Sequence, residues 1–350
     1  MFGEPSTPLL PDLTATLPGD MPMPVGAQAA EGILRAHYGI EGEAVAMTGE
    51  RDENFCIRKD GVATYVLKVP GAGQPQADAD LFVSVLRHLE REAPLLPVPR
   101  LVCGRSGEDV TAFTDAGGGR RRALLYSFLP GTPLIDAPRV AAQRKQCGQL
   151  LAKTAIALKN FSHPAMHRTL VWDLRQIPAF AALLPRLDDL PAPEFITGFI
   201  DKFASVVKPR LDLLPRQFVH NDFNARNIIV DQQDASRVVG VIDFGDAVHT
   251  ARAADVAIGV IGQLSSADTA ELAMGEFIDA YQSVTPLNAE ECTLLNWLVA
   301  GRIVQNVVMT TWYRTHGPNR EHFAAFGKDF FAWRLEFAQR LVSDRALERG

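Results

Sequence analysis

The chain has 350 residues, of which 47% are hydrophobic, and its mean hydropathy is +0.01. A chain of this length and composition can bury a large core, and its length predicts roughly two domains or lobes. The formal net charge of -6 and the pI near 5.8 argue against a nucleic-acid-binding protein, which needs clustered positive charge. The one short basic run, at 120–122, follows three glycines and is typical of a solvated hairpin tip.

The cysteines and the apolar runs indicate the compartment. The four cysteines are scattered, without the C-x-x-C spacing of a metal site, and are typical of a reducing environment. No apolar run approaches the roughly 18 residues of a membrane-spanning helix, and the N-terminus lacks the basic and apolar regions of a secretory signal. We therefore expect a cytoplasmic protein that has neither a membrane nor a nucleic acid as its partner.

The N-terminal part of the chain is rich in strand patterns. Residues 1–25 contain many prolines and are predicted to be a loosely ordered arm. A short helix is expected at 28–38 and an amphipathic helix at 77–92, where apolar residues recur at helical spacing. Strands are expected on both sides of the second helix, at 53–58, 63–69, 99–103, 110–114 and 123–129.

Helical patterns dominate beyond Pro138, interrupted by short apolar strands. The helices are expected at 139–159, 193–208, 268–282, 288–312 and 321–342, and the strands at 217–220, 228–230 and 238–243. The sequence therefore predicts an α+β fold with a junction near Pro130-Gly131. We expect an N-terminal lobe at 26–130 and a helical lobe at 131–350.

One segment carries most of the chemical information. It runs from His220 to Asn227 with the pattern H-x-D-x-x-x-x-N, and sixteen residues after Asn227 comes Asp243-Phe244-Gly245-Asp246. A strand end would present Asp222, a tight loop would return Asn227, and a hairpin of apolar strands would bring Asp243 to the same edge. The side chains of Asn227 and Asp243 suit magnesium, and that of Asp222 can accept a hydroxyl proton. Each residue alone is also a common turn residue, but their joint occurrence between apolar strands favours a catalytic site.

The two motifs resemble the catalytic and metal-binding pair of the protein-kinase-like superfamily. The chain lacks the Arg of the protein-kinase H-R-D and is similar to the aminoglycoside phosphotransferase and choline kinase branch. Within that branch it looks most like the hydroxylysine kinases. The supporting segments, within a resemblance that spans roughly 30–340, are Gly49–Phe55, Tyr65–Val69, Phe128–Gly131, His163–Ala165, Trp172–Leu174 and Asp243–Thr250.

The resemblance implies a two-lobed protein-kinase-like fold and a phosphotransferase that uses ATP or GTP with Mg²⁺. It makes Asp222 the catalytic base and Asn227 and Asp243 the metal ligands, while His220 would hold the loop in place. Asp246 would lie near the transferred phosphoryl group and assist the metal or the substrate.

The resemblance also places a nucleotide site in the N-terminal lobe. Lys68 would bind the phosphates, although a lysine on an edge strand that faces water is an alternative. Its expected partner is Asp80 on the following helix. The segment with Gly49, Arg51 and Asn54 would replace a glycine-rich phosphate loop, with a plain hairpin turn as the alternative. Backbone groups of Ser127, Phe128 and Leu129 would bind the purine.

The acceptor is expected to bind in the helical lobe. A hydroxylated amine needs acidic or aromatic groups, and an amino acid also needs a fixed arginine for its carboxylate. The candidates are Trp172, Asp173, Arg302, Trp312 and Tyr313. Core packing is an equal alternative for Trp312 and Tyr313, and a structural Asp such as Asp255 is an alternative partner for Arg302.

The expected function is phosphorylation of a small hydroxylated acceptor, namely an amino alcohol or a hydroxy amino acid, with a hydroxylysine-like one favoured. Aminoglycosides, choline or ethanolamine, and homoserine are the alternative acceptors. A nucleotide-binding pseudokinase is another class, which the complete set of catalytic residues argues against. A protein kinase is disfavoured because no A-P-E segment or long activation loop follows Asp243-Phe244-Gly245.

Overall fold

The computed structural model describes residues 24–47, 52–71, 73–316, 323 and 328–343. The expected arm at 1–25 lies almost wholly outside these residues, as do Gly49 and Arg51 of the expected phosphate-binding segment.

The N-terminal part is built on one antiparallel sheet with the order β1-β2-β3-β6-β4, and β5 also pairs with β6. Asp60 and Gly61 connect β2 to β3, and both have a positive φ, which a two-residue hairpin turn requires. The strands are β1 (Glu43–Met47), β2 (Glu53–Lys59), β3 (Val62–Val69), β4 (Leu101–Val102), β5 (Thr111–Thr114) and β6 (Arg120–Ser127).

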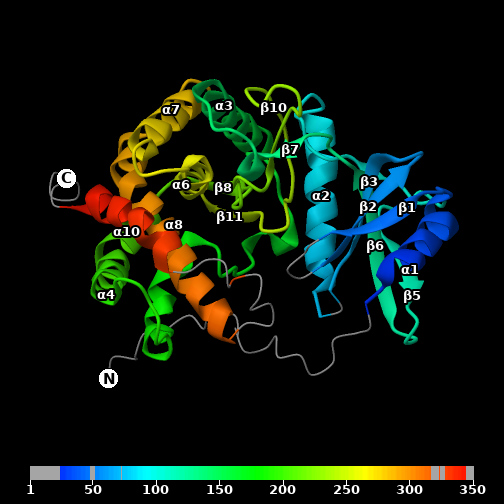
Figure 1. Cartoon of the computed structure of the whole chain (residues 1–350), viewed down its shortest axis with the longest axis horizontal. Helices are drawn as coiled ribbons and strands as arrows, with labels where there is room; N and C mark the ends of the chain where they lie inside the picture. Colours follow the sequence, from blue (N-terminus) through cyan, green and yellow to red (C-terminus); the bar gives the residue numbers. More distant parts are fainter. Residues whose placement is uncertain (1–23, 48–51, 72, 317–322, 324–327, 344–350) are drawn as a thin grey trace.

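Two helical segments cover the two faces of this sheet. The helix α1 (Gly26–Ile33) and the turn η1 (Leu34–Tyr38) form one small core with the strands. The helix α2 (Gln76–Glu92) buries Leu81, Val85 and Leu89 in a second core that continues into the C-terminal part. Figure 1 shows α2 standing between the sheet and the helical part. The helix α2 therefore connects the sheet to the core of the C-terminal part.

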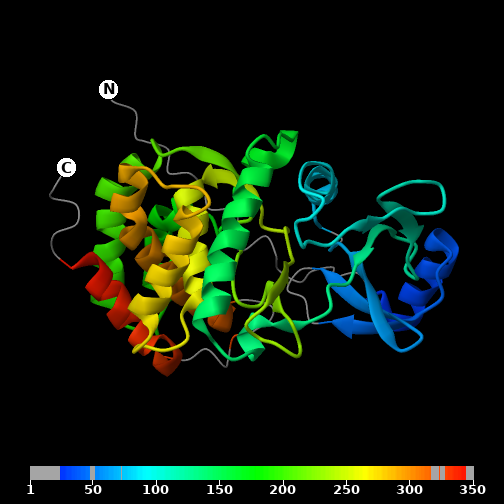
Figure 2. The same ribbon diagram turned by 90° about the horizontal axis from the view of Figure 1, so that it is seen from above.

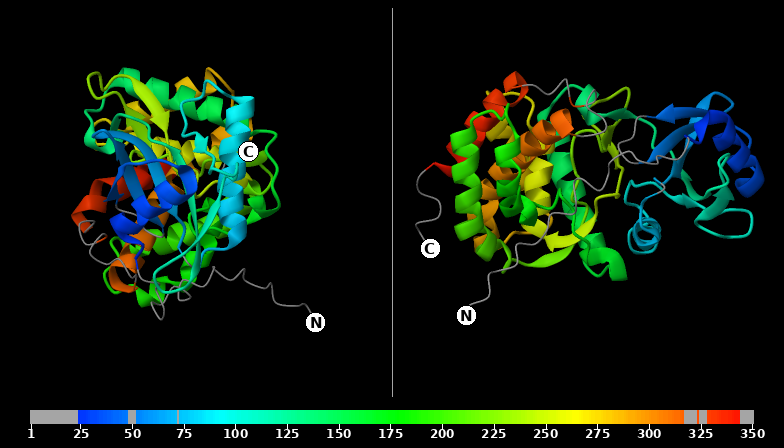
Figure 3. Two further views of the ribbon diagram at one scale, coloured as in Figure 1. Left: turned by 90° about the vertical axis from the view of Figure 1, so that its right-hand side faces the viewer. Right: turned by 90° about the horizontal axis from the view of Figure 1, so that it is seen from below.

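The C-terminal part is mainly helical (Figure 2). Its α-helices are α3 (Ala141–Leu158), α4 (Pro193–Lys202), α5 (Lys208–Leu211), α6 (Arg252–Gln263), α7 (Ala270–Gln282), α8 (Ala289–His316) and α10 (Lys328–Val342). Shorter helical segments are η2 (Leu134–Asp136), η3 (Pro164–His167), η4 (Leu174–Ala182), η5 (Leu184–Arg186) and η6 (Phe203–Val207). The view from below in Figure 3 separates these helices from the N-terminal sheet.

Two small sheets also belong to the C-terminal part of the chain. One has the order β10-β9-β7, and the other pairs β11 with β8. The strands are β7 (Thr132–Pro133), β8 (Arg216–Val219), β9 (Ile228–Val230), β10 (Val238–Val241) and β11 (Val248–Ala251). The α+β fold class expected from the sequence is confirmed.

Among the described helices, α8 is long and apolar enough to cross a membrane by length and composition, with a hydropathy of 1.2. The sequence alone predicts no such run, because Arg302 and Asn306 interrupt the apolar residues. In the structure 78% of the apolar window of α8 is buried inside the fold, as expected of a core helix.

The contact between α3 and α7 offers a test of the helical core. A Cβ atom added at Gly148 would overlap the carbonyl oxygen of Phe277 and lie 3.0 Å from Cβ of Ala280. Gly148→Ala should therefore lower the free energy of unfolding by about 1–3 kcal/mol through overpacking. Gly198→Ala, in an exposed part of α4 with nothing within 4 Å, should raise it by about 0.5–1 kcal/mol. Urea denaturation measures both, and equal effects would contradict the close contact.

Candidate active site

The loop from His220 to Asn227 connects β8 to β9 and is fixed to the segment after β10. The backbone N–H of Ile242 donates to the carbonyl oxygen of Asn227 at 2.8 Å, which holds Asp243 beside the loop. Burial lowers the pKa of His220 to about 4, so its ring is neutral. Nε2 donates to the carbonyl oxygen of Ile242 at 3.0 Å, and Nδ1 accepts from the N–H of Asp222 at 3.2 Å. With both ring nitrogens engaged, His220 holds the loop and transfers no proton.

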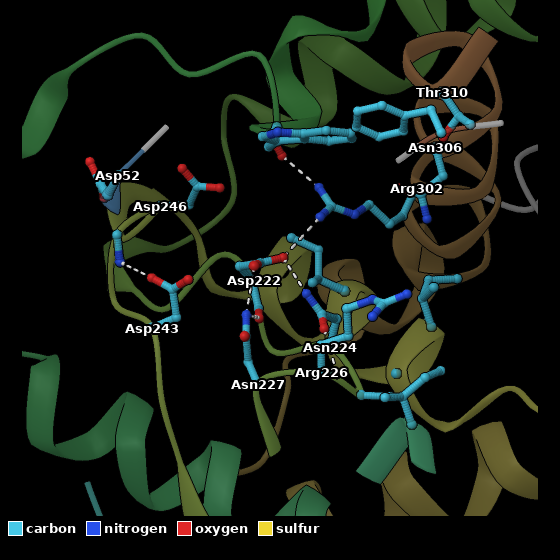
Figure 4. Close-up of a pocket in the computed structure, with 18 of the residues that line it drawn as sticks. Asp52, Asp222, Asn224, Arg226, Asn227, Asp243, Asp246, Arg302, Asn306 and Thr310 are labelled. Carbon is cyan, nitrogen blue, oxygen red and sulfur yellow. Dashed lines mark hydrogen bonds and ion pairs between the residues drawn. The ribbon is translucent and has the colours of Figure 1, made fainter. Parts of the chain in front are cut away.

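The carboxylate of Asp222 is held by three side chains (Figure 4). Oδ1 accepts from Nδ2 of Asn224 at 2.7 Å and lies 3.4 Å from Nη2 of Arg302, while Oδ2 accepts from Nδ2 of Asn227 at 2.7 Å. Burial, and then the negative charge of Asp246, raise the pKa of Asp222 to about 8, although Arg302 opposes the rise. A carboxyl group with a raised pKa is a stronger base than a surface aspartate, which suits the removal of a hydroxyl proton.

Asn227 and Asp243 fit a magnesium ion. Nδ2 of Asn227 donates to both the backbone oxygen and Oδ2 of Asp222, so its amide oxygen remains for a cation. Asp243 adopts a φ of 62°, which Asp tolerates better than most residues, and its Oδ1 accepts from the N–H of Gly245 at 3.1 Å. Both side chains line the same pocket as Asp246. Mg²⁺ prefers a ligand set of this kind: one amide oxygen and one carboxylate, completed by phosphate oxygens and water.

Lys68 forms an ion pair with Asp52, whereas the sequence analysis expected Asp80. Asp80 follows Asp78 by two residues, so the two side chains leave α2 in nearly opposite directions. Asp78 and Phe82, one helical turn apart, line the pocket. Asp78 pairs with Arg168 at 3.2 Å. Burial lowers the pKa of Lys68, but the charges of Asp52 and Asp243 outweigh burial and raise the pKa above its ordinary value.

The remaining nucleotide-site expectations stay predictions. Asn54 lines the pocket on β2. Ser127 ends β6, and Phe128 and Leu129 follow it at the junction of the two parts; all three lie outside the residues that line the pocket. The N–H of Phe128 is already engaged with the carbonyl oxygen of Thr64 at 2.9 Å.

Two expected acceptor residues meet beside Asp222. Arg302 is 5% exposed and lies in the core helix α8, and its partner is Asp222 rather than the alternative Asp255. Its Nη1 donates to the carbonyl oxygen of Trp172 at 2.9 Å and to Oε1 of Gln305 at 2.8 Å. The guanidinium also lies 5.1 Å from the ring centroid of Trp172. Arg302 thus fixes both the carboxylate of Asp222 and one wall of the pocket.

The other three expected acceptor residues lie outside the pocket lining. Asp173 is 1% exposed, caps η4 and accepts from the guanidinium of Arg175 at 2.6 Å and 2.8 Å. The ring of Trp312 stacks on His316, and Tyr313 stacks on Phe323. The positions of Trp312 and Tyr313 correspond to the core-packing alternative.

The structure adds pocket residues that the sequence analysis missed. On α8, Asn306 and Thr310 follow Arg302 at helical spacing and line the pocket, so polar residues on one stripe of an apolar helix were an available signal. Asp52, Asn224 and Arg226 are further examples, and α10 contributes Phe330, Phe331 and Arg334. The cavity that joins the Lys68 and Arg302 sides has a volume of about 1170 Å³, which is large for one small molecule.

A family comparison agrees with this geometry. The profile of the phosphotransferase enzyme family, APH, matches residues 45–290, more than half of the chain. The chain belongs to this family. It is a small-molecule phosphotransferase that transfers phosphate to a hydroxyl acceptor.

Among its relatives is hydroxylysine kinase from Mus musculus, 24% identical over 330 residues, with 87% of each chain covered. Homoserine kinase from Methylobacillus flagellatus is 38% identical over 213 residues, which cover 60% of this chain and 61% of that one. A solved structure of amicoumacin kinase in complex with AMP-PNP, Ca²⁺ and Ami has a TM-score of 0.67 at 15% identity. The match covers 92% of this chain and 97% of that one.

The Lys68–Asp52 pair predicts how the nucleotide site responds to mutation. Asp52 competes with phosphate for the lysine, so Asp52→Asn should lower the KM for Mg-ATP or Mg-GTP by about two- to tenfold. Asp80→Asn is the matched control and should leave this KM unchanged. Steady-state kinetics at fixed acceptor concentration measure both. A lowered KM in Asp80→Asn with no effect of Asp52→Asn would mean that Lys68 pairs with Asp80 rather than with Asp52 and would contradict the assignment.

Proposed function

We propose that this phosphotransferase uses Mg²⁺ and ATP or GTP to phosphorylate the hydroxyl group of a small hydroxy amino acid, with a hydroxylysine-like acceptor favoured over other amino alcohols. The observation that carries the proposal is the distribution of charge in the pocket around Asp222.

Arginines outnumber carboxylates on the acceptor side of the pocket. Beyond the catalytic Asp222, Asp243 and Asp246, no acid from the described part of the C-terminal lobe lines the cavity. The same lobe contributes four arginines to the lining, at 139, 226, 302 and 334, of which Arg139 and Arg302 already contact other groups of the protein. A polycationic aminoglycoside or a choline cation needs acidic groups or a full aromatic cage, whereas a carboxylate needs guanidinium groups. This wall therefore favours an acceptor that carries a carboxylate.

The catalytic residues support direct transfer of the γ-phosphoryl group. The acceptor hydroxyl would approach Asp222, which takes its proton as the oxygen–phosphorus bond forms and the bond to the departing nucleoside diphosphate breaks. Magnesium, held by Asn227 and Asp243, would offset phosphate charge. Lys68 would bind phosphate oxygens, and Arg302 keeps Asp222 in place. Such catalysis depends mainly on positioning and electrostatics.

Homoserine is a second candidate acceptor. The homoserine kinase relative has the higher identity over its shorter matched length, and homoserine is also a hydroxy amino acid. Both candidates satisfy the charge argument, and they differ in length and in the second amine of hydroxylysine.

An acceptor panel tests the proposal. Purified protein, Mg²⁺ and ATP or GTP are incubated with 5-hydroxylysine, homoserine, ethanolamine, choline or an aminoglycoside, and nucleoside diphosphate release is followed. We expect kcat/KM for one of the two hydroxy amino acids to exceed that of the other three acceptors by at least about tenfold, because a charged hydrogen bond is lost without the carboxylate. Preference for choline or an aminoglycoside, or no stimulated turnover with any acceptor, would overturn the proposed function.

A further inference from the structure

The helix α10 presents an arginine to the pocket in an unusual environment. Arg334 lies one helical turn after Phe330 and Phe331, and all three line the cavity. The guanidinium of Arg334 lies 4.2 Å from the ring centroid of Phe330 and 4.4 Å from that of Trp333. Two aromatic rings therefore restrict a flexible side chain to one region of the pocket.

Arg334 has no anionic partner among the residues that the structure describes. Its Nη1 donates to the carbonyl oxygen of Phe330 at 2.7 Å, within its own helix. Burial lowers the pKa of Arg334 to about 10, and no neighbouring carboxylate opposes the effect. A partly buried charge is usually paired, because desolvation costs free energy that a partner has to offset. A ligand anion would supply such a partner.

Two other arginines that line the pocket, Arg139 and Arg302, already contact other groups of the protein. Arg302 donates to Trp172 and Gln305 and contacts Asp222, so its two terminal nitrogens already have partners. Arg139 donates to the carbonyl oxygen of Gly262 at 2.8 Å, near the C-terminus of α6, a common structural use of arginine. Arg334 is therefore better placed than either to bind an incoming anion.

The position of α10 fits a role in acceptor binding. This helix packs against α8, as Figure 1 shows, and α8 carries Arg302, Asn306 and Thr310 on the pocket wall. One end of an acceptor can thus face Asp222 while the other faces α10. The nucleotide side of the cavity, with Lys68 and Asp52, is lined by the N-terminal lobe.

We propose that Arg334, framed by Phe330 and Trp333, binds the carboxylate of the acceptor and makes this enzyme selective for hydroxy acids. This inference rests on the proposed function and identifies the residue that selects acceptors with a carboxylate. The planar guanidinium can bind a carboxylate through two parallel hydrogen bonds, which a neutral amide cannot reproduce.

The test compares an acid with its carboxamide. Using 5-hydroxylysine or homoserine, whichever the wild-type enzyme turns over faster, kcat and KM are measured for the acid and for its amide. Arg334→Gln should raise KM for the acid by about 10- to 100-fold with little change in kcat, and should change KM for the amide by less than about twofold. Arg334→Lys keeps the charge but not the planar group and should fall between.

Controls separate this inference from the proposed function. Arg340→Gln, on the same helix but outside the pocket lining, should match the wild type, and unchanged affinity for the nucleotide would show that Arg334→Gln is folded. Turnover of the acid with an unchanged KM in Arg334→Gln, or an equal loss on acid and amide, would overturn the role of Arg334 alone. No turnover of either acid by the wild type would overturn the proposed function and this inference with it.

Discussion

The geometry of the site depends on one buried carboxylate, that of Asp222, and on the donors that hold it. Asn224 and Asn227 come from the same loop, and Arg302 reaches it from a helix eighty residues further along the chain. A buried carboxylate without such donors would be costly. The strands β8, β9 and β10 fix the loop from one side, and the core helix α8 fixes the arginine from the other. Two separate parts of the chain therefore fix the position of the Asp222 carboxylate.

A second constraint links the two parts of the protein. Arg168 pairs with Asp78 on α2 and donates to the carbonyl oxygen of Ala247 at 2.9 Å, just beyond the Asp243–Asp246 motif. The helix α2 also carries Phe82, which packs near Lys68. Arg168 therefore connects the Lys68 side of the pocket to the Asp243–Asp246 motif. Side-chain contacts as well as the backbone thus link α2 to the segment that carries Asp243.

The parts of the site that the sequence could predict are those that depend on local structure. His220 to Asn227 form one loop, and the β9–β10 hairpin returns Asp243 within a few residues, so spacing alone indicates that they converge. The expected partner of Lys68, Asp80, lies on the following helix, but the actual partner is Asp52, two residues before the residue that faces Lys68 in the β2–β3 register. Trp312 and Tyr313 are residue types that can bind a cation, but in the structure their rings stack on His316 and Phe323. Arg334 carries no local signal, because its role depends on how α10 packs against α8.

The most direct test of the central claim is the replacement of Asp222 by Asn, which keeps the shape of the side chain and removes its basicity. The account predicts that turnover with the best acceptor falls by about 10²- to 10⁴-fold, while the affinity for Mg-nucleotide, measured by calorimetry, stays within about threefold, because the proposal assigns the phosphates to Lys68 and the magnesium ion to Asn227 and Asp243. A variant that retains turnover within tenfold of the wild type would contradict the role of Asp222 as the base on which this site is built.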